Sequence, residues 1–345
     1  MVKKQSVYIN GLFLGQEMTG VQKFAFAICQ EMARLDIEII FLCPKSIKTK
    51  PSFGHIQKFG KLNRHLWEQI TLPLYLKRNK IKTLVNLCNT APLLSSENIL
   101  CIHDLSFYNY GKWFSKMYSC FYRFLTPKIV KKAKNIITVS EFSKKQIVET
   151  YSIKPEKIKV IYNGIYFNDS STDRNFSAPN RKYILFVGSL NPRKNLSMLI
   201  EAVEGIGQND LDLIIVGKKS KIFKNEESSK STQIKFYDQT NDSELQKLYK
   251  NAEMLVMPSY YEGFGLPVLE ALSFGCPVIC SDIPVFQELF KNFVIFFNLE
   301  SKEELKQKIV SILNKEQLIN INKKELIKKY NYSNGAKLML EIINS

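Results

Sequence analysis

The chain alternates short apolar runs with segments whose apolar residues recur every three or four positions. In the first half, apolar runs predict strands at residues 6–13, 37–43, 83–88, 97–105, 135–140 and 157–165. The segment GVQKFAFAICQEMARL, which follows the first run, has its apolar residues at helical spacing. Strands that alternate with helices predict a parallel sheet covered by helices on both faces.

The same alternation begins again after the polar stretch FNDSSTDRNFSAPNR, which has no apolar periodicity and is the best linker candidate. Strands are predicted at 182–190, 211–218, 234–238, 253–259, 276–282 and 293–298, with helices at 195–206, 243–252 and 267–275. The pattern predicts an α/β fold of two tandem Rossmann-like domains that face each other across a deep cleft, because ligands bind at the carboxyl ends of such strands. The predicted divisions are a basic first domain at 1–165, a linker at 166–182, a second domain at 183–325 and a C-terminal helix at 326–345 that packs back on the first domain.

Length and composition agree with two globular domains. The chain has 345 residues, of which 45% are hydrophobic and 23% charged, and no apolar run approaches the ~18 residues of a membrane span. The start, MVKKQSVYINGLFLGQ, has no small-residue cleavage site and predicts no signal peptide. Seven cysteines without a CxxC pair predict buried free thiols in a reducing cytoplasm and argue against zinc.

The positive charge is concentrated in the first half. Residues 1–165 hold 26 Lys and Arg against 10 Asp and Glu, a net charge of +16, whereas residues 166–345 hold 23 against 22, a net charge of +1. A one-sided basic surface favours an anionic partner, either nucleic acid or the inner leaflet of a membrane. The alternative is solvated lysine on a Lys-rich sequence. No zinc finger or recognition helix accompanies the charge, so we expect no nucleic-acid partner.

The segment 112–134 mixes aromatic and basic residues. Helical spacing could lay its apolar side chains against lipid with the lysines at headgroup level; these are Trp113, Phe114, Met117, Phe121 and Phe124. The alternative is that the same side chains form part of the first domain's core. Together with the basic first half, the segment predicts peripheral contact with an anionic membrane surface.

The stretch YYEGFGLPVLEALSFGCPVICSD carries two glutamates around a glycine turn. Pro267 suits the first turn of a helix that Gly275 can end, and the helix N-terminus is a ready site for phosphate. Glu262 precedes this anion site and Glu270 lies within the helix, so the two would bracket an extended ligand with hydroxyl groups at two places and phosphate between them. A sugar nucleotide has that form. Alone, the spacing is weak, and a solvated helix glutamate with a loop charge is then the better explanation.

Other strand ends add polar residues. VGSLNPRKN places Arg193 and Lys194 after a strand, where two cations near a helix N-terminus would neutralise a diphosphate without a metal, and we expect them near the Glu262 loop. TGVQKF places Gly20 at the start of a helix, either for close approach to a ligand or as a simple cap. HDLSF places His103 and Asp104 after an apolar strand, although a lone histidine is more often structural.

Two further patterns argue against other chemistries. The D-x-D of Asp210 and Asp212 precedes an apolar strand and is interpreted as a strand-entry turn, so we expect no metal. EGIGQND has only two of the three glycines of a dinucleotide-binding GxGxxG, and no P-loop occurs.

These motifs together resemble those of the retaining sugar-nucleotide glycosyltransferases of family 4, which have the two-domain GT-B fold. The resemblance extends over nearly the whole chain, through NGLFLGQEMTGVQKFA, HDLSF, VSEFSKKQI, VIYNGI, VGSLNPRKN and LYKNAEMLVMPSYYEGFGLPVLEALSFGCPVICSDIP. It implies metal-independent transfer of a hexose-type sugar from a nucleotide-diphosphate sugar, most simply a GDP- or UDP-sugar, without another cofactor. The implied acceptor is a glycan, expected to be lipid-linked and at the inner face of a membrane in surface polysaccharide synthesis.

The resemblance also implies roles for individual residues. Glu262 would contact donor sugar hydroxyls near the reacting carbon, and Glu270 the ribose hydroxyls. His103 would lie close to the donor sugar and Asp104 on the acceptor side. The implied donor-binding set is completed by Gly20, Arg193, Lys194, Gly263, Phe264, Gly265 and Leu266.

Two departures from the family pattern weaken inference of the donor. Ser189 stands where many members have arginine, and Tyr166 where many have aspartate. The alternatives left open are the same chemistry on a soluble acceptor, an inactive homologue that binds sugar nucleotides, and a nucleic-acid-binding protein.

Overall fold

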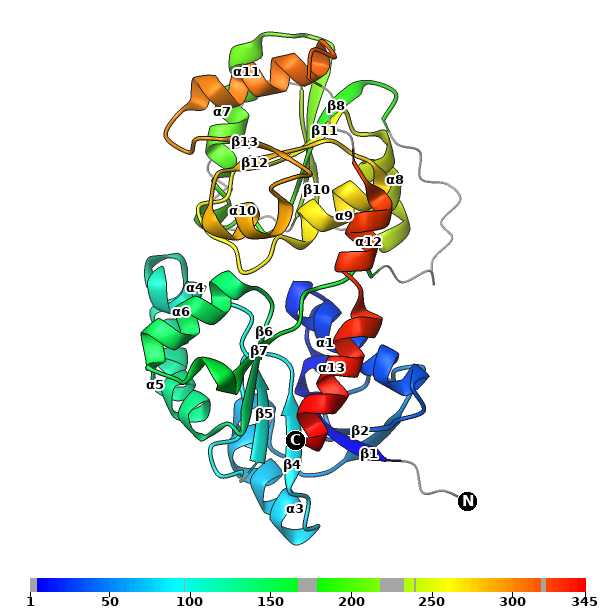
Figure 1. Cartoon of the computed structure of the whole chain (residues 1–345), viewed down its shortest axis with the longest axis vertical. Helices are drawn as coiled ribbons and strands as arrows, with labels where there is room; N and C mark the ends of the chain where they lie inside the picture. Colours follow the sequence, from blue (N-terminus) through cyan, green and yellow to red (C-terminus); the bar gives the residue numbers. More distant parts are fainter. Residues whose placement is uncertain (1–4, 96, 167–178, 218–232, 239, 318–320) are drawn as a thin grey trace. The chain divides into compact units, whose positions relative to one another are not determined.

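The computed structural model describes residues 5–95, 97–166, 179–217, 233–238, 240–317 and 321–345. The chain forms two compact units. Unit 1 combines residues Met1–Gly164 with Tyr330–Ser345, and unit 2 spans Ile165–Lys329 (Figure 1). Each is described separately below.

Unit 1 is built on one parallel sheet with the strand order β3-β2-β1-β4-β5-β6-β7. Its described strands are β1 (Ser6–Asn10), β2 (Glu38–Cys43), β3 (His55–Lys58), β4 (Thr83–Asn86), β5 (Glu97–Cys101), β6 (Asn135–Thr138) and β7 (Ile158–Val160). The central strands are almost wholly buried, as expected for a parallel sheet covered on both faces. The order reverses between β1 and β4, which makes this the switch point of the sheet.

The helices of unit 1 include one from the end of the chain. The described helices are α1 (Gly20–Arg34), α2 (Arg64–Leu66), α3 (Leu72–Arg78), α4 (Ser106–Asn109), α5 (Lys116–Lys132), α6 (Glu141–Tyr151) and α13 (Tyr332–Asn344). α13 lies beside α1 (Figure 1), where a side-chain carbon at Gly335 would come within 3.0 Å of Ile28. The C-terminal segment therefore completes the core of unit 1.

Unit 2 repeats the doubly wound design. Its parallel sheet has the order β10-β9-β8-β11-β12-β13, with the switch point between β8 and β11. The strands are β8 (Lys182–Val187), β9 (Leu211–Val216), β10 (Ile234–Tyr237), β11 (Met254–Met257), β12 (Val278–Ser281) and β13 (Ile295–Phe297). The described helices are α7 (Leu196–Ile206), α8 (Asp242–Asn251), α9 (Leu266–Phe274), α10 (Pro284–Phe290), α11 (Lys302–Leu313) and α12 (Lys323–Lys329).

Several predicted details need correction. The predicted end of the second domain at residue 325 falls inside α12, which contacts α9 and contains the buried Leu326, and the structure divides the chain after Lys329. The last residue of the predicted linker, Lys182, already belongs to β8, while residues 167–178 lie outside the described part of the chain. All seven cysteines are free, as predicted, but Cys120 is exposed and Cys88 half-buried.

Candidate active site

The candidate active site lies in unit 2, at the carboxyl ends of β8 and β11. These neighbouring strands border the switch point, where doubly wound sheets bind their ligands. The loop after β8 carries Arg193 and Lys194 in a short 3-10 helix, and the loop after β11 carries Glu262. The two loops also meet through their backbones, because the amide of Tyr260 donates to the carbonyl of Arg193 at 2.9 Å.

Arg193, Lys194 and Glu262 form an ion cluster in which Lys194 and Glu262 are buried and Arg193 is partly buried. Lys194 Nζ donates to Glu262 Oε1 at 2.5 Å, and Arg193 Nη1 lies 2.8 Å from Glu262 Oε2. The hydroxyl of Ser259 also donates to Glu262 Oε1, at 2.8 Å. Arg193 further donates to the carbonyl of Tyr261. The expected proximity of the basic pair and the Glu262 loop is therefore present.

The charges of this cluster fix the ionisation of its carboxylate. Burial by itself raises the pKa of Glu262, but attraction and hydrogen bonds from Arg193 and Lys194 outweigh it and lower the pKa to about 2. Glu262 is thus ionised at neutral pH and cannot act as a proton donor there. The cluster thus combines two cationic side chains with one carboxylate, and cations held in this way favour an anionic ligand.

Glu270 lies in α9, and its carboxylate is held by a tyrosine that the sequence did not single out. Tyr249, from α8, donates its hydroxyl to Glu270 Oε2 at 2.9 Å, and both residues are buried. Burial and the neighbouring Glu270 charge raise the pKa of Tyr249 well above its ordinary value, so it remains a donor. The contact joins residues of two helices. The one signal in the sequence is that both residues lie in the motif LYKNAEMLVMPS…LEA.

A glycine turn connects Glu262 to α9. Gly265 has φ +101°, in the left-handed region, and a side-chain carbon there would come within 2.5 Å of Phe286. The helix then begins at Leu266, one residue earlier than predicted, and ends before Gly275, whose φ is +82°. Only glycine fits at 265. The turn that it permits places the N-terminus of α9 directly after the Glu262 loop.

His103 lies in unit 1, after β5. Its Nε2 is 2.9 Å from the carbonyl oxygen of Leu87, and because a carbonyl only accepts, Nε2 carries the proton. Burial lowers the pKa of His103, so the ring is neutral at pH 7. Its backbone amide donates to Asn89 Oδ1 at 2.8 Å, and the ring of Phe24 packs against it edge-on.

The other two predicted residues of unit 1 have local structural contacts. Asp104 Oδ1 accepts from the backbone amide of Ser106, the first residue of α4, at 2.8 Å. Gly20 is the first residue of α1, preceded by Thr19, whose amide donates to Gln22 at 3.3 Å. Their proposed ligand contacts remain predictions.

Asp212 of the D-x-D lies within strand β9 of unit 2, and not in a turn before the strand as predicted. Asp212 is fully buried on β9, with Lys235 Nζ at 2.6 Å from Oδ2 and Arg181 Nε at 3.3 Å from Oδ1. Within the described residues no group of three or more His, Cys, Asp or Glu side chains is arranged to hold a metal ion.

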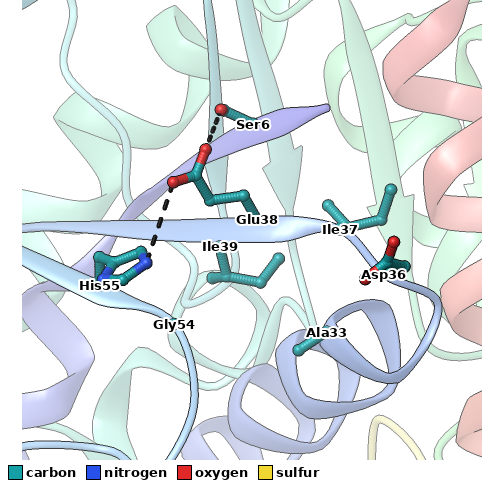
Figure 2. Close-up of a pocket in the computed structure, with 8 residues that line it drawn as sticks. All are labelled: Ser6, Ala33, Asp36, Ile37, Glu38, Ile39, Gly54 and His55. Atoms are coloured by element: carbon teal, nitrogen blue, oxygen red, sulfur yellow. Dashed lines mark hydrogen bonds and ion pairs between the residues drawn. The ribbon is translucent and has the colours of Figure 1, made fainter. Parts of the chain in front are cut away.

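A hollow of about 440 Å³ in unit 1 has none of the predicted site residues in its lining. It opens at the amino ends of β1, β2 and β3, where Glu38 accepts from the hydroxyl of Ser6 and lies 3.9 Å from Nε2 of His55 (Figure 2). Ligands of parallel sheets bind at the opposite, carboxyl edge, so this hollow is not a candidate active site.

Two doubly wound units, with a cation pair at the switch point of the second, define an enzyme of the GT-B class. A family model described as Glycosyltransferase Family 4 matches residues 18–168, and one described as Glycosyl transferases group 1 matches residues 168–333. The chain belongs to the glycosyltransferases that combine these two domains. The predicted glycosyltransferase family and the prediction of two Rossmann-like domains are thereby confirmed.

Individual relatives and solved structures agree with this assignment. The chain is 29% identical over 327 residues to the O-antigen chain mannosyltransferase RfbU of Salmonella typhimurium, covering 88% of this chain and 90% of the relative. It is 26% identical to an N-acetylgalactosaminyltransferase of Campylobacter jejuni whose name specifies a diphospho-undecaprenol acceptor, over 71% of this chain and 63% of the relative. The structure of Anabaena HepE with UDP and glucose superimposes with a TM-score of 0.75 at 15% identity, covering 99% of this chain and 100% of the other, a likeness of fold.

Proposed function

We propose that this glycosyltransferase moves a hexose-type sugar from a nucleotide-diphosphate sugar to a hydroxyl of a lipid-linked glycan, with retention of configuration and without a metal. The observation that carries the proposal is the ion cluster of Arg193, Lys194 and Glu262 at the switch point of unit 2. A diphosphate needs fixed cations, and a sugar needs a hydrogen-bond acceptor nearby; the cluster supplies both.

The proposed reaction breaks the bond between the anomeric carbon and the diphosphate oxygen. Negative charge develops on the leaving diphosphate, where Arg193, Lys194 and the N-terminus of α9 stabilise it by preorganised electrostatics. The acceptor oxygen bonds to the anomeric carbon on the same face, and its proton passes to the departing diphosphate. Glu262, ionised throughout, accepts hydrogen bonds from donor sugar hydroxyls. Glu270 does the same for the ribose, and the neutral His103 is proposed to contact the donor sugar.

The names of relatives support the choice of acceptor and pathway. RfbU is named as an O-antigen chain mannosyltransferase, and the Campylobacter relative as acting on a diphospho-undecaprenol-linked sugar. We therefore propose work in surface polysaccharide assembly, at the cytoplasmic face of a membrane that the basic first half attracts. In the described part of the chain, no helix is long and apolar enough to cross a membrane.

A thermal-shift panel of GDP-, UDP-, ADP- and dTDP-sugars tests donor binding, since a ligand at 100 times its dissociation constant adds about 2.7 kcal/mol of stability. The product's anomeric configuration, determined by NMR with EDTA present, tests retention and metal independence. Transfer to a water-soluble glycan alone would favour the alternative of a soluble acceptor. Donor binding without transfer or hydrolysis would indicate an inactive homologue.

Two variants separate the roles of the glutamates. Glu270→Ala should raise the dissociation constant of the nucleotide about tenfold, because charge-assisted hydrogen bonds to the ribose are lost. Glu262→Ala should mainly lower kcat, because its contacts lie beside the reacting carbon. Equal losses of binding and turnover in both variants would contradict these roles.

A further inference from the structure

One continuous helical segment of unit 1 shows apolar side chains on both of its faces. It runs from α2 through the π-helical turn Trp67–Thr71 into α3, over residues 64–78. Its inner face is buried: Trp67, Leu72 and Leu76 belong to the core. Its outer face carries three exposed aliphatic side chains, and we call these the outer stripe: Leu66, 62% exposed; Ile70, 50%; and Leu74, 65%.

The outer stripe forms a straight row. Its residues are four positions apart, a spacing that places side chains on one side of a helix with a slow drift around it. The wider π turn between Leu66 and Ile70 opposes this drift. From Leu66 to Leu74 the row extends about 12 Å, at 1.5 Å per residue. Scattered exposed leucines are ordinary, but an aligned aliphatic row on a helix that is already anchored in the core indicates an interaction surface.

The segment is rigidly fixed beneath the stripe. Glu68 is fully buried on the inner face, where it accepts from Asn10 Nδ2 at 2.7 Å and from the hydroxyl of Thr90 at 2.8 Å. Gln69 donates to the carbonyl of Ala91 at 3.0 Å and accepts from the amide of Leu93. The stripe is therefore presented on a fixed support, and rotating the helix to hide it would break these contacts.

The charges around the stripe identify its partner. In residues 61–82, all of which the structure describes, every exposed charged side chain is basic, and the single acidic residue is the buried Glu68. The cations bracket the row, with Lys61 and Arg64 at one end and Lys77 and Arg78 at the other. Aliphatic side chains between terminal cations suit the boundary between acyl chains and anionic headgroups.

The neighbouring helix α5 adds a second exposed element. The ring of Phe121 packs on His65 at 4.7 Å between centroids, which joins α5 to the start of the stripe segment. Met117 and Phe124 of α5 are exposed, with Lys128 Nζ over the Phe124 ring, whereas Phe114 and Phe121 pack against the core. Of the predicted membrane segment 112–134, Phe114 and Phe121 thus pack against the core while Met117 and Phe124 are exposed, and the prediction did not include the stripe.

We propose that the outer stripe inserts into the surface of a bilayer that carries anionic lipids, and that this contact holds the enzyme at its acceptor. The inference deepens the proposed function and rests on it only for the lipid-linked nature of the acceptor. The partner is the bilayer surface itself, recognised by aliphatic insertion together with headgroup contacts from the bracketing cations.

The test is flotation of the full-length chain with phosphatidylcholine vesicles, with and without phosphatidylglycerol. Replacing Leu66, Ile70 and Leu74 with glutamine should weaken binding to anionic vesicles about tenfold or more, without loss of folding, because all three side chains are exposed. The matched control is Ile327→Gln. Ile327 is also 50% exposed and also lies among lysines, on α12 of unit 2, and its replacement should leave vesicle binding unchanged.

A second probe reports insertion directly. Ile70→Trp should show blue-shifted fluorescence with anionic vesicles and quenching by brominated acyl chains. Three outcomes would each overturn the proposal. The triple variant could bind vesicles as well as the wild type, or the wild type could bind neutral and anionic vesicles equally. Light scattering could also show that the stripe instead holds two copies of the chain together. Nucleotide-sugar thermal shifts on the same proteins distinguish the two proposals. Vesicle binding without donor binding would contradict only the proposed glycosyltransferase function. Donor binding without vesicle binding would contradict only the proposed insertion of the outer stripe.

Discussion

The ionised form of Glu262 is stabilised by two cations, Arg193 and Lys194. Protonation of Glu262 should therefore change the free energy of unfolding by a measurable amount. Its folded pKa of about 2 lies below the ordinary glutamate value, so ionised Glu262 stabilises the fold above pH 4.5, and the contribution is lost as pH falls toward 2. Two and a half pKa units correspond to about 3 kcal/mol at most. The cluster therefore stabilises the two loops that carry it.

We expect this linkage to appear in a comparison of wild type with Glu262→Gln. The variant cannot lose a proton at this position, so the difference in the free energy of unfolding should narrow by about 1 kcal/mol between pH 6 and pH 4. Urea denaturation, monitored by a probe that reports on unit 2, measures this difference in the free energy of unfolding. A difference between wild type and variant that stays constant from pH 6 to pH 4 would show that the cations do not hold Glu262 ionised.

Tyr249 is expected to position Glu270 for the nucleotide. Tyr249→Phe removes one hydroxyl from a buried carboxylate and keeps the ring, so the dissociation constant of the nucleotide should rise about five- to tenfold with little change in kcat. Tyr183→Phe is the control, because its hydroxyl is equally buried and donates to the carbonyl of Leu248 at 2.8 Å. Tyr183→Phe should lower the free energy of unfolding as much as Tyr249→Phe does, without changing the affinity for the nucleotide. Equal loss of affinity in both would indicate general loosening of the core.

At the scale of elements, the glycine turn before α9 sets where the helix begins. Gly265→Ala should cost the ~1 kcal/mol of a positive φ plus about 1–3 kcal/mol for overpacking against Phe286, which is fully buried and cannot move aside. Gly207→Ala separates the two effects, because Gly207 has φ +69° with no atom within 4 Å of the added carbon. Thermal unfolding should show the larger loss at 265, accompanied by weaker donor binding. Equal losses of stability in Gly265→Ala and Gly207→Ala would mean that the turn at 265 shifts to accommodate the added carbon without an overpacking cost.

Long apolar runs predicted most of the elements, because buried parallel strands need them on both faces. β3 escaped prediction because HIQK is largely exposed at the edge of its sheet and lacks such a run. The segment 64–78 escaped for a different reason. Its apolar residues occupy both faces, so no single amphipathic stripe marked it as a helix.

The candidate site shows the same division between local and distant information. Arg193, Lys194 and Glu262 could be brought together from the sequence because they follow strands predicted to end at one edge of a sheet. Tyr249 could not, since its contact with Glu270 depends on how α8 packs on α9. The charge state of Glu262 likewise required distances, because burial and ion pairing shift its pKa in opposite directions.

At the scale of the whole molecule, the chain leaves unit 1 at Gly164 and returns to it at Tyr330. The returning helix α13 is part of the core of unit 1. Tyr332 donates to Asn163 Oδ1 at 3.2 Å, its ring packs on Phe24, and Met339 is fully buried. Unit 1 is thus built from both ends of the sequence, whereas unit 2 is continuous.

This arrangement predicts that ending the chain at Lys329 damages one unit selectively. Losing the buried side chains Tyr332, Met339 and Ile342 should remove more than about 5 kcal/mol from unit 1, which is comparable to the whole stability of a domain. Hydrogen exchange resolved by peptide should show lost protection in α1 and β1 but not in β8 or β11, and nucleotide binding should persist if unit 2 alone holds the nucleotide. Glu341→Ala, on the exposed face of α13, should leave exchange in both units unchanged. Equal loss of protection in the two units would show that they fold as one.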